Sequence, residues 1–246
     1  MVIDNTALIR SLLEFPPKSS DGCLRDNTYA DQKLDRDRNS RSLAIDMRDC
    51  FYVVQLLQRQ KDNPAVQFQN PNFRNNSNRT IQQYQIYSLD DWDLKIDNII
   101  KAAKLYQARV YIDLNLKDSK DVFANLMKNM SERFATGNFT KLHRIYNEAV
   151  GETNRMKGTR KSWLVDIDTK DNNVVQEMTA FIKTLIGGGN KGYGDVYATV
   201  PTKNGYHLIT TSFDSMSFNK QYPDVDVHKH NPTIAWMETD WRTANA

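Results

Sequence analysis

The sequence predicts an α+β fold in which a mixed or antiparallel β-sheet packs against helices. The first observation is periodicity: from residue 80 onward, segments with alternating apolar residues take turns with segments whose apolar residues recur every three or four positions. The second is order, because three strand-like segments follow one another near the C-terminal end, which indicates an α+β or α/β layer. The third is size, since 246 residues with 39% hydrophobic content are enough to bury a core.

The first 79 residues are predicted to form a helical and irregular region that precedes a core of residues 80–246. Its predicted parts are, in order, a helix over Thr6–Phe15, a polar loop over residues 18–41, a second helix over Ser42–Arg59 and a loop over residues 63–78. The first helix stops at Pro16 and Pro17, which do not continue it. The second has apolar residues at helical spacing, and the loop after it is rich in Asn and Gln.

The predicted core alternates strands with helices. Its elements are, in order, strand Thr80–Ser88, helix Trp92–Gln107, strand Arg109–Leu116, helix Ser119–Phe134, strand Lys161–Asp168, helix Asn173–Ile186, and strands Asp195–Val200, Tyr206–Thr211 and Val225–Val227. Ser88 is predicted to cap the first helix, with Asp90 and Asp91 in the first turn, where the helix dipole favours carboxylates. The polar residues that suggest chemistry lie on the later strands and on the turns between them.

Two aspartates share one face of a predicted strand. Asp166 and Asp168 alternate with Val165 and Ile167, so the carboxylates point to one side and the apolar side chains to a core on the other. They lie about 6–7 Å apart along the strand, and like charges at this spacing repel unless a cation or a proton lies between them. A divalent-metal site for phosphoryl or nucleotidyl transfer is the leading interpretation. The alternative is a pair of solvated acids on an exposed strand edge.

A polar turn follows at Thr202–His207. Its Asn204-Gly205 pair favours a tight turn with positive backbone dihedral angles. Such a turn offers backbone N–H groups, the Lys203 ammonium and the His207 imidazole to an anion. The alternative is a plain hairpin turn, followed by a half-buried histidine at the start of the next strand.

A second acidic strand lies within Asp224–His230, where acids and imidazoles alternate. We expect Asp226 to be a third metal carboxylate, in preference to Asp224, because Asp226 lies between Val225 and Val227. The alternative is an edge strand whose charges prevent aggregation. Arg160 belongs to a basic cluster just before the Asp166 strand; such a cluster is usually a solvated loop, but beside a metal site it would steer phosphates.

Charge and cysteine content limit the function classes. A net charge of +3 is compatible with a nucleic-acid ligand without requiring one. The two cysteines, Cys23 and Cys50, lack the spacing of a zinc site or a disulfide framework, which fits a reducing cytosol. No stretch approaches eighteen apolar residues, and the N-terminus lacks a basic segment followed by an apolar run. We therefore expect a soluble, cytoplasmic protein that is neither exported nor bound to a membrane.

In this order, the three motifs resemble those of the archaeo-eukaryotic primase superfamily, which includes primase–polymerases. The motifs are Asp166-Ile167-Asp168, then Thr202-Lys203-Asn204-Gly205-Tyr206-His207, in which Ser is commoner than Thr at the first position, and then Val225-Asp226. Ala108–Ile112 also resembles the strand that precedes the first motif in small members. The resemblance covers roughly Thr80 to Trp236, and the N-terminal third of the chain has no counterpart in it.

The resemblance implies a catalytic core built on an RRM-like sheet with flanking helices, which would act as a nucleotidyltransferase in DNA replication or repair. The implied residues are Asp166, Asp168 and Asp226 for catalysis and for Mg²⁺ or Mn²⁺, and His207, Lys203, Thr202 and Arg160 for the nucleotide. The implied partners are nucleoside triphosphates, single-stranded or primed nucleic acid, and a replication helicase or other replication proteins. A small stand-alone member suits a phage or mobile-element replication gene.

Two other function classes stay open. A metal-dependent nuclease would use the same carboxylates, with water as the nucleophile. A non-catalytic protein that binds nucleic acid or a protein partner would keep the fold without the reaction.

Overall fold

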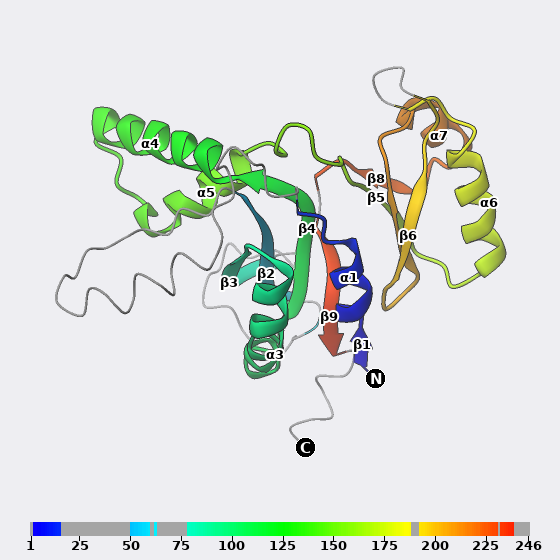
Figure 1. Cartoon of the computed structure of the whole chain (residues 1–246), viewed down its shortest axis with the longest axis horizontal. Helices are drawn as coiled ribbons and strands as arrows, with labels where there is room; N and C mark the ends of the chain where they lie inside the picture. Colours follow the sequence, from blue (N-terminus) through cyan, green and yellow to red (C-terminus); the bar gives the residue numbers. More distant parts are fainter. Residues whose placement is uncertain are drawn as a thin grey trace. The chain divides into compact units, whose positions relative to one another are not determined.

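A computed structural model of the chain describes residues 2–15, 50–59, 62, 78–187, 192–230 and 232–238 (Figure 1). The strands are β1 (Val2–Asp4), β2 (Cys50–Arg59), β3 (Asn78–Ile86), β4 (Arg109–Asp118), β5 (Trp163–Ile167), β6 (Val196–Pro201), β7 (Tyr206–Thr210), β8 (Asp226–His228) and β9 (Thr233–Glu238). The helices are α1 (Thr6–Leu12), α3 (Leu89–Leu105), α4 (Ser119–Thr136), α5 (Ile145–Glu152), α6 (Asn172–Ile182) and α7 (Ser215–Gln221), with a short 3-10 helix at Leu142–Arg144. None of the helices within these ranges is long and apolar enough to cross a membrane.

The predicted α+β class is confirmed. The strands form two sheets, one in the order β1-β9-β4-β2-β3 and the other in the order β6-β7-β5-β8. The pairs β1–β9, β4–β9, β2–β3, β5–β7, β5–β8 and β6–β7 are antiparallel. The predicted strands and helices from residue 80 onward are found with bounds shifted by a few residues, and Ser88 caps α3 as expected, accepting a hydrogen bond from the Asp91 N–H at 3.0 Å.

The predicted helix over Ser42–Arg59 is wrong over the part that the structure describes, because residues 50–59 form strand β2. Residues 42–49 and the predicted loop over residues 18–41 lie outside the described ranges, as does the predicted loop over residues 63–78 except for Asn78, the first residue of β3. β2 pairs with β3 on one side and β4 on the other, and most of its side chains are buried. A strand that is buried on both faces carries a continuous apolar run, whose spacing also satisfies a helical pattern.

Contacts divide the chain into two compact units. The first contains residues 1–14, 52–116 and 157–246, and the second contains residues 15–51 and 117–156. Within the second unit, α4 packs against α5, and Arg133 of α4 forms an ion pair with Glu148 of α5. The predicted boundary at residue 80 stays a prediction; β1 and β2, which precede residue 80, pair with strands that follow it.

One face of the four-stranded sheet is apolar, whereas the other face carries both polar and apolar side chains. Val165, Ile167 and Leu208 point to a core that also contains Val175 of α6 and Phe218 of α7, so the two helices cover this face (Figure 1). Asp171 and Asp214 cap the two helices with their carboxylates. Because neighbouring residues of a strand point to opposite faces, the residues between the core positions face away from these helices.

Buried polar groups join the two sheets within the first unit. The Asn5 side-chain amide donates to the carbonyl of Pro201 at 3.0 Å and to that of Ile234 at 3.1 Å, which links β6 to β9. The Asn115 side chain of β4 exchanges two hydrogen bonds with the backbone of Ser162, next to β5. Amide side chains suit this task because they donate and accept at once.

Candidate active site

Strand pairing brings three of the predicted site residues together on the face of the four-stranded sheet that points away from α6 and α7. Asp166 of β5 lies opposite His207 of β7 and, on the other side, opposite Asp226 of β8. Directly opposed residues of antiparallel strands project to the same face. Asp168 lies just after the end of β5, close enough for its charge to act on Asp166.

A pocket of about 310 Å³ opens on this face. It is lined by Arg59, Asp62, Arg109, Tyr111, Leu164, Asp166, Asp168, Thr202, Lys203, Asn204, His207, His228, Pro232 and Ile234. Five of the seven predicted residues are therefore in one pocket. The other two, Asp226 and Arg160, are outside its lining; Asp226 is exposed and acts on the site only through its position opposite Asp166.

The acidic groups of the site influence one another. Burial raises the pKa of Asp166 above its ordinary value, and the neighbouring charge of Asp168 raises it further, with a smaller contribution from Asp226. His228 and Arg59 act in the opposite direction. A cation next to the Asp166 carboxylate would therefore relieve its repulsion by Asp168 and Asp226.

His207 is held neutral. Burial lowers its pKa to about 4, and the positive charges of His228 and Arg109 act in the same direction. Its Nδ1 lies 3.0 Å from the Thr233 hydroxyl of β9, and its Nε2 lies 3.5 Å from a carboxylate oxygen of Asp166. At neutral pH the ring therefore provides one N–H donor and one acceptor instead of a positive charge.

The Thr202–Gly205 turn is closed by two hydrogen bonds. The Thr202 N–H donates to the Gly205 carbonyl at 2.9 Å, and the Gly205 N–H donates to the Thr202 hydroxyl at 3.1 Å. The predicted positive dihedral angles are wrong, because neither Asn204 nor Gly205 has a positive φ. Glycine is required here for another reason: a Cβ at residue 205 would lie 1.9 Å from the Ile167 carbonyl oxygen. The turn thus lies directly against the end of β5 that carries the aspartates.

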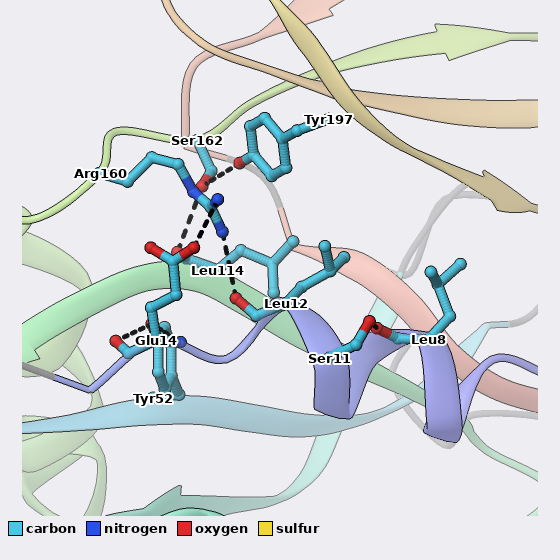
Figure 2. Close-up of polar contacts among 9 residues, drawn as sticks. All are labelled: Leu8, Ser11, Leu12, Glu14, Tyr52, Leu114, Arg160, Ser162 and Tyr197. Atoms are coloured by element: carbon cyan, nitrogen blue, oxygen red, sulfur yellow. Dashed lines mark hydrogen bonds and ion pairs between the residues drawn. The ribbon is translucent and has the colours of Figure 1, made fainter.

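The Arg160 side chain contacts neighbouring parts of the fold, away from the pocket lining (Figure 2). Its guanidinium forms an ion pair with Glu14 at 2.7 Å, donates to the Leu12 carbonyl at 3.2 Å, and lies 3.9 Å from the centre of the Tyr197 ring. These contacts connect the segment before β5 with the end of α1 and with β6. The predicted role of Arg160 in nucleotide binding has no support from this position.

Four polar residues of the pocket, which lie on β2, on β4 or just after β2, were not predicted from the sequence. They are Arg59, Asp62, Arg109 and Tyr111. Arg109 forms a buried bidentate ion pair with Asp62, with both N–O distances at 2.6 Å, and donates to the Tyr111 hydroxyl at 3.3 Å. A charged residue between Ala108 and Val110, at the start of an apolar strand, was the available signal for Arg109.

The carboxylates do not form a ready-made metal cage. Among the residues that the structure describes, no three His, Cys, Asp or Glu side chains are grouped so as to hold a metal ion by themselves. Mg²⁺ in nucleotide sites is usually bound by one or two carboxylates together with substrate phosphates and water. The two carboxylates of Asp166 and Asp168 fit an ion that enters with a phosphorylated substrate. They do not fit one that the protein encloses alone.

Comparisons with models of protein families, with curated proteins and with solved structures found no match for this chain.

Proposed function

We propose that the chain is a metal-dependent nucleotidyltransferase of the primase or polymerase type, with an RRM-like core, that acts on nucleic acid in the cytoplasm. The observation that carries this proposal is the convergence of Asp166, Asp168, His207 and the Thr202–Gly205 turn in one pocket. Carboxylates next to cationic and N–H groups complement an ion bound to a triphosphate.

Asp166 and Asp168 would hold the Mg²⁺ or Mn²⁺ ion, and Asp226, opposite Asp166, is the candidate third ligand. Repulsion from Asp168 adds to the effect of burial in raising the pKa of Asp166. This supports the assignment, since a bound cation would remove the repulsion. The ion would supply charge stabilisation at the reacting phosphate.

The basic and polar groups beside the aspartates would bind the phosphates. Lys203 provides a positive charge, and Arg59 adds a second one at the end of β2. His207, which is neutral, would contribute a hydrogen bond from its N–H, and Thr202 would hold the turn through its bond with Gly205. Together these groups would bind and orient the nucleotide. The partners of the protein would be a template strand and replication proteins.

The test is an incubation of the purified protein with labelled nucleotides, primed and unprimed templates, and Mg²⁺ or Mn²⁺. We expect extension of the primed templates or synthesis of new labelled strands on the unprimed ones. Asp166→Ala and Asp168→Ala should each reduce the rate by at least about a hundredfold, which is typical for loss of a charged group that stabilises a transition state, while the chain stays folded. Asp195→Asn is the matched control, because Asp195 is exposed and outside the pocket.

Three outcomes separate the function classes. Extension that survives in a folded Asp168→Ala variant would overturn the site assignment. Shortening of the labelled strand would replace the transferase with the nuclease. Binding of nucleic acid without any change in strand length would indicate the third class, a non-catalytic binding protein.

A further inference from the structure

A hydrogen bond joins the candidate site to the other sheet. The Thr233 hydroxyl, on the first residue of β9, lies 3.0 Å from Nδ1 of His207 on β7. Thr233 is 1% exposed and His207 is 8% exposed. Both partners are thus buried, and the direction of this hydrogen bond decides which ring nitrogen carries the proton.

Two observations agree on that direction. Within the described part of the chain, no second hydrogen-bond partner is found for the Thr233 hydroxyl. If this hydroxyl accepted a bond from Nδ1–H, its own O–H would be buried with no acceptor among the described residues, which is costly. In addition, Nε2 lies 3.5 Å from an oxygen of Asp166. The lone pair of an unprotonated Nε2 would be repelled by the lone pairs of the carboxylate, whereas an Nε2–H group is attracted to the carboxylate.

We propose that Thr233 is a positioning residue that donates its hydroxyl proton to Nδ1 of His207 and so holds the imidazole in the Nε2–H tautomer. The ring then presents an N–H donor to the pocket, next to Asp166. Its use for binding a phosphate oxygen rests on the proposed function, but the tautomer itself does not.

The first test needs no substrate. Long-range ¹H–¹⁵N spectra of the metal-free protein at neutral pH show which imidazole nitrogen carries the proton, and His207→Gln identifies the signals of this ring. We expect Nε2–H in the wild type and in Thr233→Ser, which keeps the hydroxyl. In Thr233→Val, which keeps the shape but has no hydroxyl, we expect a mixture with Nδ1–H.

A wild-type ring protonated at Nδ1 would overturn the inference, and so would a folded Thr233→Val variant with an unchanged tautomer. If Thr233→Val does not fold, the spectra of the wild type and of Thr233→Ser still decide which nitrogen is protonated.

The second test concerns the nucleotide. Thr233→Val should raise the nucleotide KM roughly fivefold, which corresponds to the loss of one ordinary hydrogen bond. Its kcat should stay within about twofold of the wild-type value. Thr233→Ser should have the wild-type KM. A merely structural role would not separate valine from serine in this way. If the tautomer shifts as expected but no nucleotide reaction exists, the proposed function fails and the positioning role of Thr233 stands. An unchanged KM in a Thr233→Val variant that shows the tautomer shift would remove the link to phosphate binding.

Discussion

Two arginine–aspartate pairs of the first unit have the same geometry in different surroundings. Arg109–Asp62 and Arg10–Asp93 are both bidentate, with N–O distances of 2.6 Å. The side chains of the first pair are 10% and 8% exposed, and those of the second are 43% and 47% exposed. Water screens an exposed pair, whereas a buried charge that loses its partner keeps its full desolvation cost.

We therefore predict that Asp62→Asn lowers the free energy of unfolding by about 3–5 kcal/mol, because it leaves the Arg109 charge buried and unpaired. Asp93→Asn, which breaks a pair of the same geometry at the surface, should change the free energy of unfolding little. Urea unfolding of both variants measures the difference. Equal losses in the two variants would show that burial does not set the strength of the Arg109–Asp62 pair.

At the scale of elements, the approach of the β6–β7 turn to the end of β5 positions the candidate site. Gly205 allows this approach, since any side chain there would meet the backbone of Ile167 and Thr169. Backbone atoms do not move aside as the end of a flexible side chain does. The turn and the strand must therefore separate if residue 205 gains a Cβ.

We predict that Gly205→Ala lowers the free energy of unfolding by at least about 2 kcal/mol, the range seen when atoms are added to a closely packed region. It should also weaken nucleotide binding, because Thr202 and Lys203 move with the turn. Gly151→Ala is the control: Gly151 lies in α5, and a Cβ there meets nothing within 4 Å. That change should stabilise the helix by about 0.5–1 kcal/mol. A Gly205→Ala protein as stable as the wild type would contradict the close approach.

At the scale of the whole molecule, the pocket is built from both sheets of the first unit. Arg109 and Ile234 come from the five-stranded sheet, and Asp166 and His207 from the four-stranded one. Asn5 and the His207–Thr233 hydrogen bond connect the two sheets. A ligand that binds in the pocket would therefore stabilise both sheets together against unfolding.

We predict that Mn²⁺ and a nucleoside triphosphate together raise Tm by more than the sum of their separate effects, because two carboxylates hold the ion only with the phosphates. At a hundred times Kd the gain is about 3 kcal/mol, or roughly 5–10 °C for a chain of this size. Asp168→Asn should lose this excess and Asp195→Asn should keep it, as measured by thermal unfolding in each buffer. Effects that simply add would indicate that the ion and the nucleotide bind independently.

Local patterns determined much of the fold. The alternation of Val165, Asp166 and Ile167 was enough to predict a strand with one apolar and one acidic face, and Ser88 marked the start of α3. Local periodicity wrongly indicated a helix at β2 and did not reveal β9, which was not predicted. Both strands are buried along nearly their whole length, so they lack the alternation that distinguishes a strand from a helix.

For the candidate site, the sequence by itself determined what lies within a few residues along one strand or turn: the proximity of Asp168 to Asp166, and that of Thr202 to His207. Only the tertiary structure decided that Asp226 lies opposite Asp166 but outside the pocket, that Arg160 is held by Glu14, and that Thr233 contacts His207. The physical reason is that side-chain periodicity is a property of the local backbone. Which distant strands become neighbours depends instead on the packing of the whole core.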